Sequence, residues 1–482
     1  MRLPQHGLSA EALLAALDDF KAKDVSWKDG RTWAYVYDPG PEADALSKQA
    51  YVRFLGENAL DPTAFPSALR LENEVVSLLA KHLNGPPGTV GSFTSGGTES
   101  IILAVKAARD AWRAAHPSDE RSPAVLMAET AHAAFHKAAH YLGIRTRVVA
   151  VDPVTFRAVP ETLIAAMDDA TCLVVASAPQ YPHGVMDPVE AIAAAAAERG
   201  LRCHVDGCVG GFMLPFFRRL GAPIPPFDFS VPGVTSISVD LHKYGFAPKG
   251  ASVVLHRSPA LRAAQFYACS TWAGYTIINP TVQSTRSAGP MAAAWTTLNF
   301  LGDDGYMALA ARMRDATARV LAGIRAIPGL AVMGEPDMNM FAFTTTDGTG
   351  VFHIADEMKV RGWTVQPQLS YGPHRENIHL SVNATAPELV EPMLAALRES
   401  VDAARALPSG HLKAAMLARY GELTPERVDE RVFFELMILA GVKGLDLPER
   451  MAGINEAIDA LAPKAREKLL LMFANLLYMA RG

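Results

Sequence analysis

The sequence has few cysteines, no long apolar run and no excess of one charge. Its 482 residues include only four cysteines, which are too few for a disulfide framework and lack the paired spacing of a metal site. The formal net charge of −5 provides no basic surface for nucleic acid or for an anionic membrane. No apolar run approaches the roughly 20 residues that span a bilayer, and the N-terminus lacks a signal-peptide pattern. We therefore expect a cytoplasmic protein with no membrane anchor and no nucleic-acid partner.

The chain alternates apolar, β-rich runs with helical patterns. Its length is too great for one hydrophobic core, so two or more domains are expected. Strands that alternate with helices predict a mostly parallel sheet that helices cover on both faces. The predicted strands are 124–128, 146–151, 171–178, 202–206, 234–240 and 250–256.

Turn signals and composition predict four parts. Residues 1–70 look irregular, apart from a short amphipathic helix that begins near Ser9. Residues 71–310 carry the predicted sheet, and a long helical pattern leads to a smaller α/β unit at 311–408. The extension 409–482 is helical, and its apolar end must pack on the small domain or on a neighbouring subunit.

Lys243 directly follows a histidine at the end of the predicted strand 234–240. Ligands collect at strand ends in open α/β sheets. A lysine that is partly desolvated there is expected to have a lowered pKa and to form a Schiff base. The alternative from this stretch alone is a surface lysine that merely follows a strand.

Two further stretches fit one cofactor together with this lysine. Small residues between Gly91 and Ser100 precede a helix, whose first N–H groups can bind phosphate, although the same pattern is also an ordinary helix cap. Asp206 ends an apolar strand and needs a cationic partner there, such as a protonated pyridine nitrogen. A phosphate site, a carboxylate for the ring nitrogen and a Schiff-base lysine are the protein groups that pyridoxal 5′-phosphate requires.

Three histidines, His132, His136 and His140, recur every four residues in a predicted helix. That spacing suits a metal site, but no carboxylate or cysteine completes it, so we predict no metal. The remaining interpretations are that the histidines line an ordinary helix, or that His132 at its start stacks on the cofactor ring.

Five motifs resemble, in the same order, those of the group II pyridoxal-phosphate-dependent decarboxylase superfamily, and most of all its sphingosine-1-phosphate lyase branch. The resemblance covers residues 30–300 and implies fold type I, the aspartate-aminotransferase-like α/β fold, with a large domain, a smaller C-terminal domain and a helical tail. The motifs are "GSFTSGGTESI", "AHAAFHKAAHYLGI", "SAPQYPHGVMDPVE", "HVDGCVGGF" and "PFDFSVPGVTSISVDLHKYGFAPKG".

The resemblance also implies a role for each matched residue. Lys243 is similar to the Schiff-base lysine, and His242 is similar to a ligand of the cofactor phosphate. The implied catalytic residues are Lys243, His132, Asp206 and Lys249, which matches a second active-site lysine of the lyases. The implied cofactor-binding residues are Gly97 and Thr98 in the phosphate loop, His132 on the ring, Asp206 at the ring nitrogen, and Ser238, His242, Lys243 and Thr285.

In the resembled family, a loop from the other subunit completes each active site, which implies an obligate homodimer. That loop resembles residues 272–289 of this chain. Thr285 and Arg286 stand where the lyases have a Ser-Arg pair.

Two positions of the substrate site depart from the lyase pattern. Asp61 stands where the lyases carry a histidine that helps to bind a phosphate, which a carboxylate would repel. Ile277 stands at the position of an active-site tyrosine, and Tyr275 lies two residues away. Asn58 of the same site is retained, so Asn58, Asp61 and Tyr275 are the candidate substrate residues.

We predict a carbon–carbon lyase that cleaves a small β-hydroxy amine by a retro-aldol reaction. An amino-acid decarboxylase is the alternative, which would be favoured if Arg286 or Arg375 bound a carboxylate away from the ring. The third hypothesis is a catalytically silent dimeric binding protein, against which the intact set of Lys243, Asp206 and His132 argues.

Overall fold

The computed structural model of the chain describes residues 3–383, 387–442 and 447–479. The outermost residues of the predicted N-terminal segment and of the helical extension lie outside these ranges. So do 384–386 of the predicted small domain and 443–446 of the extension.

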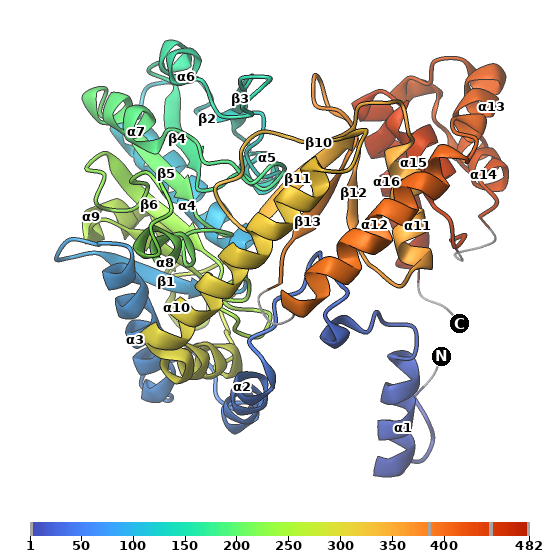
Figure 1. The fold of residues 1–482 in the computed structure, drawn as a ribbon. Coiled ribbons are helices and arrows are strands. Elements are labelled where there is room, and N and C mark those ends of the chain that lie inside the picture. The colour runs from blue at the N-terminus through green and yellow to red at the C-terminus, as the bar shows by residue number, and fades with distance from the viewer. Residues whose placement is uncertain (1–2, 384–386, 443–446, 480–482) are drawn as a thin grey trace.

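The large part of the fold is built on a seven-stranded sheet (Figure 1). All six predicted strands are present, and the sheet is mostly parallel as predicted, with β7 antiparallel to both of its neighbours. The edge strand β1 was not predicted, because its stretch was interpreted only as a phosphate loop. In sheet order the strands are β1 (Val90–Thr94), β7 (Ser252–His256), β6 (Val234–Val239), β5 (Arg202–Asp206), β4 (Thr171–Ser177), β2 (Ala124–Ala128) and β3 (Arg145–Val149).

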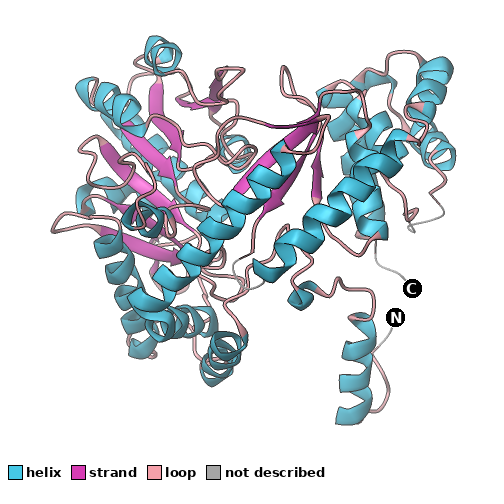
Figure 2. Ribbon diagram, viewed as in Figure 1, coloured by secondary structure: helices cyan, strands magenta, loops and turns pink. Residues whose placement is uncertain are grey.

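Helices cover both faces of this sheet (Figure 2). Successive side chains of a strand alternate between the faces, so Leu126 and Val174 join one apolar core while Met127 and Val175 join the other. The first core includes residues of α3 (Pro66–His82), α7 (Val189–Glu198) and α8 (Leu214–Arg219), and the second includes residues of α4 (Gly97–Ala115) and α5 (Ala134–Leu142). Short helices α6 (Pro160–Ala166) and α9 (Pro259–Arg262), the turn η2 (Ala263–Gln265) and the hairpin β8 (Tyr267–Cys269) and β9 (Ile277–Asn279) complete this part.

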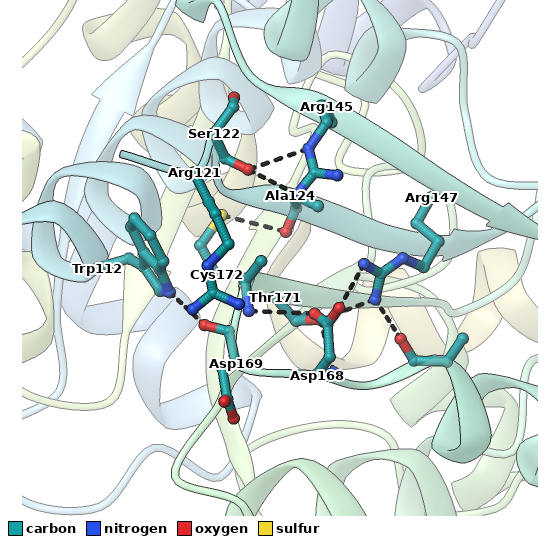
Figure 3. Close-up of polar contacts among 12 residues, drawn as sticks. Trp112, Arg121, Ser122, Ala124, Arg145, Arg147, Asp168, Asp169, Thr171 and Cys172 are labelled. Atoms are coloured by element: carbon teal, nitrogen blue, oxygen red, sulfur yellow. Dashed lines mark hydrogen bonds and ion pairs between the residues drawn. The ribbon is translucent and has the colours of Figure 1, made fainter. Parts of the chain in front are cut away.

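Polar contacts close the edge of the sheet where β2 and β4 begin (Figure 3). Arg147 forms an ion pair with Asp168 at 2.7 Å, and Trp112 Nε1 donates to the Asp169 carbonyl at 2.8 Å. Cys172 is one of three buried free thiols, and burial raises its pKa to about 12. These contacts stabilise the edge of the sheet at which β2 and β4 begin. It is the edge opposite to the carboxyl ends of the strands.

A long helix, α10 (Gly289–Arg325), leads to the small domain as predicted. It bends at Gly302, whose φ of 57° and ψ of −174° are not helical. It packs against α2 (Pro41–Arg53) and α3, and its second half joins the core of the small domain. That domain has a four-stranded antiparallel sheet of β10 (Leu330–Val332), β11 (Met340–Thr345), β13 (Asn377–Ser381) and β12 (Gln366–Gln368), with α11 (Val351–Val360), η3 (Pro387–Leu389) and α12 (Val390–Arg405).

The N-terminal segment joins the two domains. Ser9 caps α1 (Ala10–Phe20), as predicted, by accepting a hydrogen bond from the Ala12 N–H. After η1 (Trp27–Asp29), Trp33 is buried in the core of the small domain. Its backbone N–H donates to the Thr364 carbonyl at 2.9 Å. The chain then returns to the large domain through α2.

The helical extension contacts the small domain through the start of α15 (Ala452–Asp459). Asp356 of α11 accepts hydrogen bonds there from the N–H groups of Met451 and Ala452. The other elements of the extension are α13 (His411–Tyr420), η4 (Pro425–Arg427), α14 (Glu430–Leu439) and α16 (Pro463–Leu477). The apolar end of the extension lies in α16, which packs on other elements of the extension and keeps Leu471 and Leu477 exposed, so what covers that end, the small domain or a neighbouring subunit, stays a prediction. Across the ranges given above, none of the helices combines the length and the apolar character that a membrane span requires.

Buried neutral histidines make the free energy of unfolding depend on pH. Burial lowers the pKa of His204 to about 4, although the charge of Asp206 opposes the shift. An unfolded chain binds this proton near pH 6.5, so the free energy of unfolding falls as the pH drops from about 6.5 towards 4. We expect His204→Gln to reduce this slope by up to about 1.4 kcal/mol per pH unit, as measured by urea titrations between pH 7 and pH 5. An unchanged slope would mean that His204 is not kept neutral in the folded protein.

Candidate active site

A cavity of about 350 Å³ lies where β4, β5 and β6 end and α4 begins. Its volume falls in the range of small-molecule sites. It brings together six residues that the sequence predicts as cofactor ligands: Gly97, Thr98, His132, Asp206, His242 and Lys243. The remaining lining residues are Ser95, Gly96, Glu99, Ile101, Ser177, Pro179, Tyr181, Cys208, Val209 and Asp240.

One end of the cavity is the N-terminus of α4. The Glu99 carboxylate reaches back and accepts a hydrogen bond from the Ser95 N–H at 2.7 Å, which fixes the loop before the helix. A Cβ at Gly97 would lie 2.8 Å from both carboxylate oxygens of Asp240 and from the Cys208 sulfur, so this position requires glycine. Free N–H groups of a first helical turn and a residue without a side chain suit a phosphate group.

The other polar wall carries Asp206 and His132. Asp206 ends β5, is 7 % exposed, and accepts a hydrogen bond from the Cys208 N–H at 3.1 Å. His132 lies just before α5, where its Nδ1 accepts from the Ala134 N–H at 3.1 Å. The carboxylate and the imidazole are therefore both held by backbone groups, and both line the same cavity.

Lys243 lies in the turn that follows β6, and its environment corrects one prediction. Its Nζ lies 3.0 Å from Oδ2 of Asp240, three residues earlier. Burial is the largest single influence and lowers the pKa of Lys243, but the Asp240 carboxylate, with smaller contributions from Cys208 and Tyr37, raises it, and the net result is a raised pKa and not the lowered one predicted. The sequence-based expectation considered desolvation and missed the neighbouring charge.

Three other predicted residues lie outside the lining of this cavity. The Ser238 hydroxyl is buried between His204 Nε2 at 3.1 Å and the Cys208 sulfur at 3.2 Å. Thr285 is exposed in the loop before α10. Lys249 Nζ donates to the His242 carbonyl at 3.3 Å, next to the cavity.

Tyr37 is a residue of this region that the sequence did not single out. The Lys249 ammonium lies 4.7 Å from the centre of the Tyr37 ring, and that ring packs edge-on against Tyr244 at 4.9 Å. The segment around Tyr37 was interpreted only as irregular, and no motif marks it. Its role depends on the return of the chain from the small domain, which a local pattern does not encode.

Two of the three candidate substrate residues, Asp61 and Tyr275, line a second cavity of about 810 Å³. Asp61, Tyr275 and Ile277 are brought together there, and no residue lines both cavities. Asp61 is exposed and accepts hydrogen bonds from the N–H and the hydroxyl of Thr63. Asn58 forms a β-bridge with Ser287, which joins its segment to the loop 272–289.

The residues that line the first cavity fit pyridoxal 5′-phosphate. A helix N-terminus, a carboxylate and a lysine meet in a volume of suitable size, and Gly97 leaves a space at the helix N-terminus that a Cβ would fill. Gly97, Thr98 and His242 would hold the phosphate, Asp206 the ring nitrogen and Lys243 the carbonyl carbon. Within the part of the chain that the structure describes, no group of three or more His, Cys, Asp or Glu residues could hold a metal ion.

Comparisons with known proteins give consistent results. The pyridoxal-dependent decarboxylase conserved domain matches residues 2–346, and a C-terminal candidate HTH domain of pyridoxal-dependent enzymes matches residues 412–476. Sphingosine-1-phosphate lyases are similar over most of the chain. The protein from Oryza sativa subsp. japonica is 39 % identical over 427 residues, which are 87 % of this chain and 77 % of that protein. The protein from Rattus norvegicus is 37 % identical over 83 % of this chain and 69 % of its own length.

Solved structures extend the comparison to the fold. A sphingosine-1-phosphate lyase from Burkholderia pseudomallei has a TM-score of 0.79 and 35 % identity, and the match covers 87 % of this chain and 96 % of that one. A glutamate decarboxylase from Lactobacillus brevis has a TM-score of 0.75, with coverage of 85 % and 96 %. At 19 % identity that likeness concerns the fold alone.

Replacement of Asp206 tests the ring end of the cavity. We expect Asp206→Asn to weaken binding of pyridoxal 5′-phosphate at least tenfold, because a hydrogen bond to a charged group contributes about 1.5–3 kcal/mol. Absorbance titration of the cofactor-free protein measures the affinity. Asp169→Asn, at an exposed carboxylate outside this cavity, is the matched control. Equal affinity in the two variants would exclude Asp206 as the partner of the ring nitrogen.

Proposed function

The chain belongs to the pyridoxal-dependent decarboxylase family, is a lyase of fold type I with pyridoxal 5′-phosphate as its cofactor, and we propose that it cleaves a carbon–carbon bond in a β-hydroxy amine. The products would be an aldehyde and an amine. The observation that carries this proposal is the pair of Lys249 and Tyr37 beside the proposed cofactor-binding lysine.

Retro-aldol cleavage requires a base at the β-hydroxyl group. When bound, pyridoxal 5′-phosphate supplies a carbonyl that captures an amine and a ring that accepts the electron pair of the broken bond. The protein must therefore orient the Cα–Cβ bond, remove the hydroxyl proton and protonate the carbon that is left. Decarboxylation needs no base at a hydroxyl, so such a base distinguishes the two reactions.

Lys249 has the environment of such a base. Its side chain is exposed at the rim of the cavity, yet partial desolvation lowers its pKa and the charge of Lys243 lowers it further, which increases the fraction of free amine near neutral pH. Burial raises the pKa of Tyr37, so the phenol keeps its proton. We assign removal of the hydroxyl proton to Lys249, with the Tyr37 ring as the surface that holds its ammonium form.

The decarboxylase alternative needs an arginine that is available for a substrate carboxylate. Arg286 is buried and paired with Glu72 at 2.7 Å. Arg375 donates to the Thr345 carbonyl at 2.9 Å and lies 3.6 Å from Glu376. Both of the arginines that the sequence nominated are therefore already engaged, which favours the retro-aldol reaction.

We also propose that two copies of the chain share their active sites. The loop 272–289 and the segment around Asp61 meet in a cavity separate from the first, which suits a contribution to the site of a second copy. In that arrangement Thr285, Tyr275 and Asp61 would reach the cofactor and substrate of the partner. Asp61 would then disfavour an anionic head group on the substrate.

Product analysis tests the proposed reaction. The purified protein, loaded with cofactor, is offered amino acids, β-hydroxy amines, and long-chain amino alcohols with and without a phosphate group. We expect an aldehyde without carbon dioxide, and a preference for substrates without phosphate. Carbon dioxide with the matching amine would establish the decarboxylase instead, and cleavage of only the phosphorylated compound would overturn the role given to Asp61.

Two variants separate the roles of Lys249 and Tyr37. We expect Lys249→Met to lower kcat by about 100-fold or more, in the range known for loss of a general base, while the cofactor absorbance is retained. Tyr37→Phe keeps the ring face under Lys249 and is expected to have a smaller effect. The acidic limb of the pH–rate profile should disappear only in Lys249→Met. A larger loss in Tyr37→Phe than in Lys249→Met would transfer the role of the base to the phenol.

A further inference from the structure

We propose that Asp240 is a positioning residue that stores Lys243 as an ammonium ion and so sets the pH at which the protein captures its cofactor. The proposal rests on the role given above to Lys243. It concerns a step before any turnover, when the cofactor-free protein meets pyridoxal 5′-phosphate.

The contact between the two side chains is built into the turn after β6. The Lys243 N–H donates to the Asp240 carbonyl at 3.2 Å, and the Asp240 N–H donates to the Cys208 carbonyl at 3.3 Å. The carboxylate is 3 % exposed and the lysine side chain 19 %, so water screens the 3.0 Å ion pair only weakly. The backbone of this turn therefore brings the carboxylate and the ammonium together before any ligand binds.

Asp240 is the group that carries a negative charge against this ammonium at neutral pH. The Cys208 thiol and the Tyr37 phenol also face Lys243, and burial raises the pKa of both, so they stay neutral. His242 Nε2 lies 3.6 Å from the Asp240 carboxylate, and burial lowers the pKa of that imidazole to about 4. The charge of Lys243 also lowers the pKa of Lys249, and the Asp240 carboxylate acts in the opposite direction.

An ammonium ion has no lone pair and does not attack a carbonyl. Capture therefore begins when Lys243 gives a proton to the solvent. The amine nitrogen then bonds to the aldehyde carbon, and the carbonyl oxygen leaves as water. Because Asp240 favours the ammonium form, it keeps the concentration of the free amine low and places the rise of the capture rate at high pH.

Asp240 also faces the phosphate end of the cavity. Its Oδ1 has no hydrogen-bond donor within the described ranges, and both of its carboxylate oxygens lie 2.8 Å from the position of a Cβ on Gly97. Loss of its charge would therefore also ease the approach of a phosphate dianion. A probe without phosphate is needed to isolate the effect on Lys243.

The test follows capture of pyridoxal, which has no phosphate, and of pyridoxal 5′-phosphate by stopped-flow absorbance between pH 6.5 and 9. With pyridoxal, we expect the wild-type rate to rise about tenfold per pH unit, as for attack by the free form of a protonated amine. Asp240→Asn should capture pyridoxal at least tenfold faster at pH 7, with its rise shifted to lower pH. Asp169→Asn, at an exposed carboxylate outside this cavity, is the matched control and should keep the wild-type rate and pH dependence.

Several outcomes would overturn the proposal. The first is that the rate of pyridoxal capture depends on pH in the same way in Asp240→Asn and in the wild type. The second is that the wild-type rate does not change between pH 6.5 and 8, a result that can be seen without any variant. Borohydride reduction and peptide mapping identify the captured lysine. A label on a lysine other than Lys243 overturns this proposal together with the site assignment. If Lys243 carries the label but the product analysis described above detects no aldehyde, only the proposed reaction is overturned.

Discussion

Burial of both faces of the seven-stranded sheet is the constraint on which the rest of the structure depends. Strands β2 and β4 send alternate side chains into two apolar cores, and β5, β6 and β7 send side chains into the first of these cores, so charged groups on interior residues would be buried without partners. The charged groups of this cavity lie at the carboxyl ends, where Asp206 ends β5 and Asp240 and Lys243 follow β6, whereas the buried His204 and Ser238 inside these strands form a hydrogen bond with each other. Because β5 and β6 are parallel neighbours, their ends lie at one edge, opposite the N-terminus of α4. The first cavity therefore forms at the edge of the sheet where these charged residues lie.

The small domain reaches the same edge by two routes. The N-terminal segment threads Trp33 into the core of the small domain and then places the Tyr37 ring beneath Lys249. From the other side, His379 of β13 stacks at 4.4 Å on Tyr181, which lines the first cavity. The two domains are therefore joined at residues that line or border the first cavity. A change in their relative position would move Tyr37 and Tyr181 against the wall that the sheet provides.

The sequence was sufficient to predict those elements whose structure is determined by one local pattern. Apolar, β-rich runs predicted six strands. Asp206 was singled out as a carboxylate at the end of a buried strand and Gly97 through the resemblance of its motif to a phosphate loop, and both line the first cavity. Contributions that depend on tertiary contact were missed. Tyr37 becomes important only when the chain crosses back from the small domain. The pKa of Lys243 was predicted in the wrong direction because desolvation was weighed without the ion pair to Asp240, although that residue lies only three positions earlier.

For the helical extension too, tertiary contacts indicate a role that the sequence motif does not. Residues 412–476 match a candidate HTH domain, yet they contain nine basic and ten acidic residues and lack the excess of basic residues that is typical of nucleic-acid-binding domains. Their fixed contacts are with the small domain, where Asp356 of α11 holds the start of α15. Since α11 packs on β12 and β13, and β13 carries His379, the extension supports the strand that positions Tyr181 at the cavity. The charge balance and these contacts together favour a role in supporting the small domain over a role in binding nucleic acid.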